Sequence, residues 1–123
     1  MAVTTGSVAS SYIGTTIIED TDANDTVETA ASSGGTLYQV YISNTNNSGQ
    51  VYIKLYEATA GSVTLGTTPP SFIFPCLAAN TRQFDFPTGL SFASNLSFAC
   101  TTEPGTAGTT APTNDVLVRL TIG

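Results

Sequence analysis

The clearest pattern in the chain is a strict alternation of side chains over residues 36–42 and again over residues 50–56. A period of two indicates a β-strand with one buried face. The β-branched and aromatic residues of both stretches suit such a pleated, half-buried surface. The residues predicted to face the core are Tyr38, Val40, Ile42, Val51, Ile53 and Leu55. The opposite face is predicted to carry Leu37, Gln39, Tyr41, Tyr52, Lys54 and Tyr56.

The polar segment between these stretches, residues 43–49 (SNTNNSG), has the chemistry of a turn. Asn and Gly tolerate positive φ, and short polar side chains bond to their own backbone. We therefore predict a β-hairpin over residues 36–57, around which the rest of the chain is organised.

Shorter segments of strand character follow along the chain, and no window shows apolar residues at helical spacing. Gly, Pro and Thr-Thr pairs separate them at intervals of roughly eight to twelve residues, which indicates a sandwich or a barrel. We predict an all-β fold: an antiparallel β-sandwich, jelly-roll or Ig-like, of seven or eight strands. The further predicted strands are residues 12–19, 71–77, 80–86, 90–92, 96–101 and 114–122.

Residues 1–35 differ from the rest, because they are rich in Thr, Ser, Ala and Gly and hold five of the nine acidic residues. Such a segment buries too little apolar surface to offset its own ordering entropy. We expect an extended N-terminal arm with a possible edge strand, which orders against a neighbouring copy or another partner. The sandwich domain is then residues 36–123, and it should fold without the first 33 residues.

Two later loops share a motif, GTTPPS at residues 66–71 and GTTAPT at residues 108–113. The repeat predicts either two matched loops at one end of the sandwich, forming a contact surface, or ordinary turn chemistry used twice.

Charged residues make up only 10 % of the 123 residues, and the formal net charge is −6, whereas an average soluble domain carries about 25 %. The three basic residues, Lys54, Arg82 and Arg119, are too few to neutralise a phosphate backbone, so we expect no nucleic-acid partner. An anionic membrane surface is disfavoured for the same reason. The chain has no apolar run long enough to cross a bilayer and no signal-peptide pattern at its start, so we expect synthesis in a cytoplasm.

The residue types needed for catalysis are scarce. The chain has no His, and Lys54 is its single lysine, so a nucleophile lacks a base. We expect no enzyme activity, no catalytic residues, no metal and no cofactor. Asp20-x-Asp22-x-Asn24 invites a calcium site, but the required Gly and Glu positions of an EF-hand are absent, which favours a solvated acidic loop.

The two cysteines, Cys76 and Cys100, have no CxxC spacing and no His partner, so they predict no zinc site. They are either small buried side chains or a disulfide between neighbouring strands. A reducing cytosol favours free thiols.

Tyrosine on the outward strand face indicates an interface, since it combines an apolar body with a polar tip. The alternative is that these tyrosines line a second packed layer or lie under the N-terminal arm. The candidate interface residues are Tyr12, Ile17, Ile18, Tyr41, Tyr52, Lys54 and Tyr56.

Three segments carry a resemblance to a known class of protein: YIKLY at residues 52–56, GLSFASNLSFA at residues 89–99, and the apolar strand at residues 116–122. Over roughly residues 36–123 this order of strands and turns resembles small β-sandwich virion proteins of tailed bacteriophages. The matched segments are strands and turns and hold no catalytic signature.

The resemblance implies a structural role. We expect a capsid decoration (cement) protein that binds the outer capsid surface and stabilises the shell, located in the virion and assembled in the host cytoplasm. Its expected partners are the major capsid protein and its own copies, with a trimer favoured. The alternative is a tail- or fibre-associated adhesion module that binds a carbohydrate or another host-surface ligand. The lack of Trp counts against the alternative, although Tyr is able to replace it.

Overall fold

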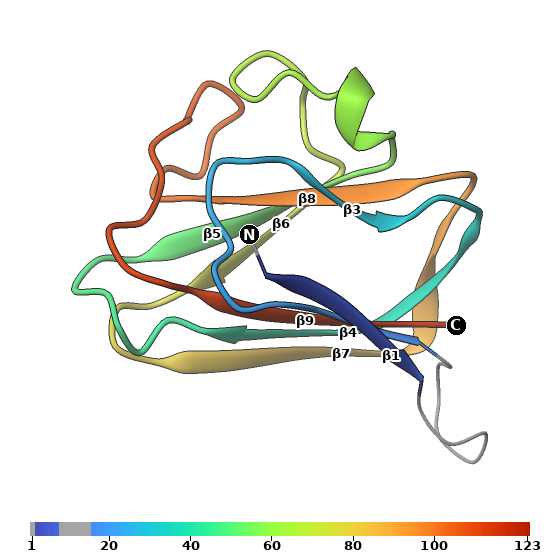
Figure 1. The fold of residues 1–123 in the computed structure, drawn as a ribbon, viewed down its shortest axis with the longest axis horizontal. Coiled ribbons are helices and arrows are strands. Elements are labelled where there is room, and N and C mark those ends of the chain that lie inside the picture. Colours follow the sequence, from blue (N-terminus) through green and yellow to red (C-terminus); the bar gives the residue numbers. More distant parts are fainter. Residues whose placement is uncertain (1, 8–15) are drawn as a thin grey trace.

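The computed structural model describes residues 2–7 and 16–123, which form two antiparallel sheets packed face to face (Figure 1). The five-stranded sheet has the order β1 (Val3–Ser7), β2 (Thr16–Asp20), β9 (Leu117–Ile122), β4 (Gly35–Ser43) and β7 (Thr81–Phe92). The four-stranded sheet has the order β3 (Glu28–Ala31), β8 (Leu96–Thr101), β5 (Val51–Tyr56) and β6 (Phe72–Cys76). One short 3-10 helix, η1 (Ala60–Ser62), lies in the loop after β5. The predicted antiparallel β-sandwich is confirmed, although the described residues form nine strands where seven or eight were expected.

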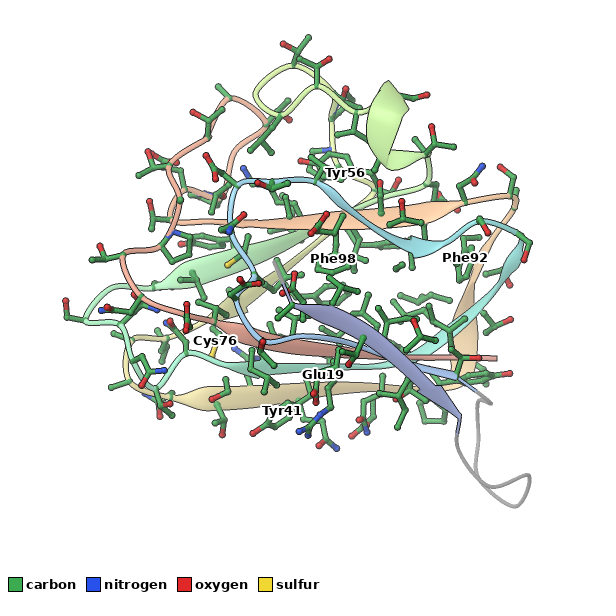
Figure 2. The ribbon with its side chains drawn as sticks, viewed as in Figure 1. Glu19, Tyr41, Tyr56, Cys76, Phe92 and Phe98 are labelled. Atoms are coloured by element: carbon green, nitrogen blue, oxygen red, sulfur yellow. The ribbon has the colours of Figure 1, made fainter. Side chains whose placement is uncertain are left out.

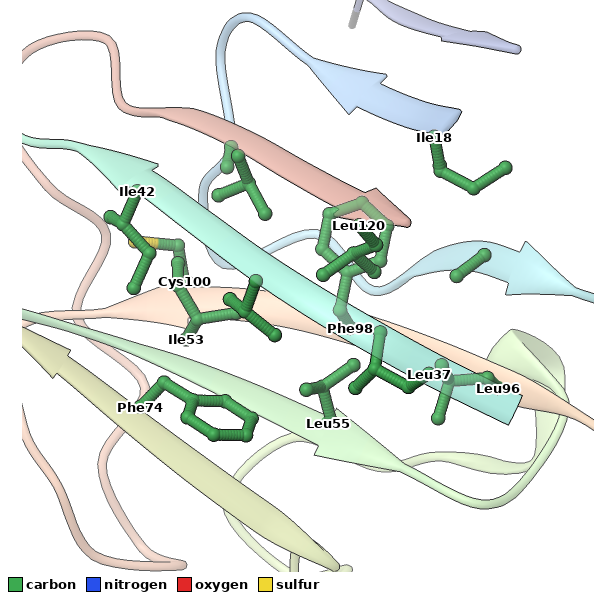
Figure 3. Packing of buried hydrophobic residues seen from close by; sticks show 14 of the residues in the cluster. Ile18, Leu37, Ile42, Ile53, Leu55, Phe74, Leu96, Phe98, Cys100 and Leu120 are labelled. Atoms are coloured by element: carbon green, nitrogen blue, oxygen red, sulfur yellow. The ribbon is translucent and has the colours of Figure 1, made fainter. Parts of the chain in front are cut away.

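The core lies between the two sheets, where alternate residues of facing strands meet (Figure 3). Burial of this apolar surface is the main favourable term in folding. Val40, Ile53 and Leu120 are fully buried at its centre. Phe74 of β6 packs against Phe84 and Phe86 of β7, with ring centroids 5.0 and 5.7 Å away. These aromatic pairs close the side of the sandwich where β6 and β7 are both edge strands.

The predicted hairpin over residues 36–57 is wrong, although both of its strands exist. β4 pairs with β7 and β9 in one sheet, while β5 pairs with β6 and β8 in the other. The segment between them crosses from sheet to sheet. Asn44 anchors this crossing, because its buried side-chain amide donates to the carbonyl oxygens of Gly49 (2.9 Å) and Leu77 (3.1 Å).

The predicted facing of β4 is wrong at its start, because the strand contains a bulge. Leu37, predicted to face outward, is 1 % exposed, and Tyr38, predicted to face inward, is half-buried. The register shifts between Leu37, which pairs with Leu90, and Gln39, which pairs with Asp85. Four residues of β7 therefore lie opposite the single residue Tyr38. Against β9 the extra residue is Tyr38 itself, because Leu37 and Gln39 pair with the adjacent residues Ile122 and Thr121. One extra residue in β4 reverses the inward and outward alternation that a period of two predicts.

Gly89 makes this bulge possible. It has φ +79°, a conformation that side chains disfavour. A Cβ atom there would lie 2.1 Å from Cγ2 of Thr36 and 3.1 Å from Cε1 of Tyr38.

The described part of residues 1–35 belongs to the sandwich and does not form a separate arm. β2 pairs with β9 within the five-stranded sheet, and β3 pairs with β8 within the other. Ile18, Ala23 and Ala30 join the core. The strand expected in this segment, residues 12–19, corresponds in its described part to β2, which is not an edge strand because it lies between β1 and β9. The edge strand is β1, which pairs only with β2 among the described strands. Sequence reasoning missed β1 and β3 because short strands of Thr, Ser and Ala with few large apolar residues resemble linkers in the sequence.

Candidate interface surfaces

The outer surface of the five-stranded sheet, here called the open face, consists of aligned rows of exposed or half-buried side chains. Residues directly opposite each other in antiparallel strands share a face, so the strand register defines the rows. One row is Ile17, Thr121, Gln39 and Asp85. The next row is Glu19, Arg119, Tyr41 and Gln83.

Tyr41, Arg119 and Glu19 form a contact group near the centre of the open face. The Arg119 guanidinium lies 5.5 Å from the centroid of the Tyr41 ring, and its Nε donates to the carboxylate of Glu19. Figure 2 shows Glu19 and Tyr41 on this face of the molecule. Exposed ion pairs and cation–π contacts contribute little to stability, but they order the side chains. The group therefore presents an ordered surface of mixed polarity.

The outer surface of the four-stranded sheet, here called the covered face, is different because two long loops lie over it (Figure 1). Lys54, predicted to be a solvated or interface cation, is 0 % exposed. Its Nζ donates to the carbonyl oxygens of Gly105 (2.7 Å) and Gly108 (2.9 Å) in the loop that follows β8. Burial lowers the pKa of Lys54. The single lysine of the chain therefore holds a loop in place.

The same loop, residues 102–110, is closed by a second set of bonds. Glu103 accepts hydrogen bonds from the amide (2.9 Å) and the hydroxyl (2.6 Å) of Thr110, which hold the pKa of its carboxyl below the usual value. The amide of Thr102 donates to the Thr110 carbonyl at 2.9 Å. A Cβ atom on Gly108 would lie 2.5 Å from Cβ of Glu103, so only Gly fits there. The loop is a folded cover over Lys54.

The second loop over the covered face connects β5 to β6 and includes η1. This loop and loop 102–110 are together called the covers. Tyr56, 1 % exposed, lies beneath the covers with its hydroxyl buried and without a hydrogen-bond partner among the described residues, and burial raises its pKa. The two loops touch, since a Cβ on Gly66 would lie 2.9 Å from Cγ2 of Thr109. The repeated GTT motifs therefore bring two matched loops together, but over the covered face.

The seven predicted interface residues separate into several environments. Ile17 and Tyr41 lie on the open face, and Ile18 points into the core at 4 % exposure. Tyr52 is half-buried on the outer side of β5, whereas the covers bury Lys54 and Tyr56. Tyr12 lies outside the described residues. For Tyr56 the alternative given above, burial under a second packed layer, is therefore correct. The layer consists of the two loops over the covered face.

Apolar exposure near β6 adds a smaller feature. Ile73 and Leu77 are 39 % and 58 % exposed and are the large exposed apolar residues of the described chain. Ile73 pairs with Lys54, and Pro75 pairs with Tyr52. Pro75 lacks a backbone donor, which suits the edge strand that its sequence position predicts.

The acidic segment after β2 contains no arrangement that holds an ion. Asp20 is buried and accepts a bond from the amide of Asp22 (3.1 Å), and the Asp22 carboxylate accepts from the amide of Ala2 (3.0 Å). Asn24 caps the amide of Thr26 at 2.8 Å. Burial raises the pKa of Asp20 to about 6. Across residues 2–7 and 16–123, no group of three or more His, Cys, Asp or Glu side chains is placed to hold a metal.

Both cysteines are free, buried thiols. Cys76 pairs with Val51 and Cys100 with Ile53, so the cysteines lie on opposite sides of β5. Strands two places apart are separated by about 9–10 Å, beyond the reach of a disulfide. Burial raises the pKa of Cys100 to about 12 and also raises that of Cys76.

In the part of the chain that the structure describes, no helix has the length and apolar character needed to span a bilayer. Comparison of the chain with protein-family models, curated protein sequences and solved structures gave no match.

Proposed function

We propose that this chain is a structural virion protein of a tailed bacteriophage, a decoration protein that lies on the outer capsid surface and stabilises the shell. The observation that carries the proposal is the difference between the two outer faces. Loops cover one sheet, and the other presents five strands of aligned side chains. A sheet face with a central aromatic and Arg group suits contact with a broad protein surface.

The composition supports the same proposal. Charged residues are 10 % of the chain, and much of the polar surface is neutral Ser, Thr, Asn and Gln. Depletion of charge is typical of the central part of protein interfaces. The resemblance of residues 36–123 to phage β-sandwich proteins points to the capsid as partner, with homo-oligomers of the chain, trimers favoured, on its surface.

Copy number in purified virions tests this proposal. Quantitative mass spectrometry should find the chain in a fixed ratio to the major capsid protein, in hundreds of copies per particle. A few copies per particle would instead indicate a tail or fibre component, and absence from virions would end the proposal.

A further inference from the structure

We propose that the hollow at the bulge between β4 and β7 is a binding site for a single unit of a neutral saccharide. The hollow lies on the open face, because Gln39, Asp85 and Thr121 belong to one of its rows. A bound saccharide and the proposed capsid contact would therefore use the same face, so the binding test uses the isolated chain. The hollow has a volume of about 270 Å³, just below the ~300–1,000 Å³ found for ligand sites, which suits a ligand the size of one sugar ring. It is lined by Tyr38, Gln39, Asp85, Phe86, Pro87 and Thr121.

The bulge creates the hollow. Because four residues of β7 lie opposite Tyr38, β7 departs from β4 between Asp85 and Leu90. The sheet surface opens at this point, and the exposed lining is mostly apolar. Phe86 is itself held from below by Phe74, 5.7 Å away between ring centroids. The hollow is therefore a stable feature of the backbone and the core.

The aromatic wall is fixed in place. The Gly89 backbone approaches the ring of Tyr38 so closely that a Cβ atom would lie 3.1 and 3.5 Å from two ring carbons. Tyr38 is half-buried, so part of its ring faces solvent. An ordered, partly exposed aromatic ring is an apolar platform with a polar tip, which suits the C–H face of a pyranose ring.

The polar wall is also ordered. Gln39 Nε2 donates to Oδ1 of Asp85 at 2.9 Å, and Gln83 Nε2 lies 3.2 and 3.1 Å from the two Asp85 oxygens. These bonds lower the pKa of the Asp85 carboxyl. A carboxylate has about four lone-pair positions, so acceptor capacity remains after these three contacts. Neighbouring sugar hydroxyls are donors that match a carboxylate held at a fixed angle.

The charge of the site selects the ligand class. Asp85 is the one charged residue in the lining, and a carboxylate repels anionic ligands at close range. A small apolar hollow with few convergent polar groups is the usual form of a ligand site. A neutral sugar ring can pack on the aromatic wall and donate hydrogen bonds to the polar wall. An acidic sugar can pack on the aromatic wall, but its charge is repelled by Asp85.

Saturation-transfer NMR on the full chain tests the site. The probes are glucose, galactose, mannose and N-acetylglucosamine, each at millimolar concentration, with N-acetylneuraminic acid as the anionic comparison. At least one neutral sugar should give a signal, and amide shifts on titration should centre on Gln39, Asp85 and Thr121. Absence of binding by all four neutral sugars, or equal binding of the anionic sugar, would overturn the proposal.

Variants locate the binding. Asp85→Asn and Tyr38→Ala should each weaken the affinity by about tenfold or more, because each removes one wall. Asp115→Asn and Tyr52→Ala make the same chemical changes away from the hollow, Tyr52 lying on the other sheet, and should leave the affinity unchanged. Thermal unfolding of each variant confirms that it is folded. Sugar binding that survives both Asp85→Asn and Tyr38→Ala would place the ligand elsewhere and contradict the assignment.

Discussion

Lys54 shows how far a residue's environment can differ from its place in the sequence pattern. An alternating strand predicts an outward side chain, and the side chain does point away from the core. It is buried all the same, because loop 102–110 folds over it and supplies two carbonyl acceptors. A buried ammonium is tolerated only where hydrogen bonds replace its water. Lys54 therefore has a structural role, and it is too buried to belong to the candidate interface.

Replacing the Lys54 ammonium should loosen this loop and leave the core intact. In Lys54→Met the carbonyl groups of Gly105 and Gly108 lose their donor, at a cost of about 1–3 kcal/mol. We expect faster hydrogen exchange at the amides of Thr102 and Gly108, which bond within the loop. Amides of β4 should exchange as in the unmodified chain. Unchanged exchange within the loop would show that Lys54 does not hold it.

Asp20 gives a prediction about pH. Burial raises its pKa from 3.8 to about 6, so the folded state binds a proton that the unfolded state releases. The associated stability is present below about pH 4 and is lost as the pH rises through 6. Relative to Asp20→Asn, which keeps the acceptor for the Asp22 amide, the unmodified chain should lose at most a few kcal/mol across this window.

The measurement is chemical unfolding of both proteins between pH 4 and pH 7. Only the difference between them is informative, because Asp22, Glu103 and Asp85 have lowered pKa values and give the opposite slope at lower pH. A difference that stays constant with pH would show that Asp20 is not buried as a neutral acid.

At the scale of elements, the period-two pattern identified the strands far better than it identified their partners. Alternation in residues 36–42 and 50–56 predicted β4 and β5 closely. The predicted pairing of β4 with β5 was wrong because a polar segment of seven residues permits either a hairpin or a crossing between sheets. The hydrogen bonds of the buried Asn44 side chain stabilise the crossing. The facing error at Leu37 arose from a bulge whose signal, Gly89, lies some fifty residues away in the chain.

The candidate site was only partly predictable for the same reason. Tyr41 was identified because outward side chains on an alternating strand are visible in the sequence, whereas Ile17 was chosen as an apolar residue of the expected arm. The loops that cover Lys54 and Tyr56 were not predicted, because the sequence of a loop has no periodicity that indicates where the loop packs. The hollow at Tyr38 depends on a register shift between distant strands, which sequence alternation does not encode.

The N-terminal strands give the clearest test of the element assignments. Deleting residues 1–33 removes β1, β2 and β3. It therefore removes one of the two partners of β8 and of β9, together with the core side chains of Ile18, Ala23 and Ala30. We now expect this truncation to unfold or aggregate, contrary to the expectation from composition. Deleting only residues 1–7 removes one edge strand and should leave a folded protein.

Circular dichroism and size-exclusion chromatography distinguish these outcomes. The shorter truncation serves as the control for loss of the terminus itself. A monomeric, β-rich product from the longer truncation would contradict the strand assignments of β2 and β3.

At the scale of the whole molecule, the sandwich has one open face and one covered face, and this difference underlies the proposed role. The covers occupy the outer side of the four-stranded sheet, so a partner that lies flat has the five-stranded sheet available to it. Tyr41, Arg119 and Glu19 lie near the middle of that sheet. Residues of this kind at the centre of an interface carry much of its binding energy.

The most direct test of the proposed role is co-sedimentation with undecorated phage capsid shells, comparing Tyr41→Ala with Tyr52→Ala. Both variants remove a half-buried tyrosine from an outer strand surface, but on opposite sheets. Tyr41→Ala should weaken binding by about thirtyfold, equivalent to about 2 kcal/mol, while Tyr52→Ala should bind as the unmodified chain does. Equal binding by both variants, or a loss confined to Tyr52→Ala, would contradict docking through the open face.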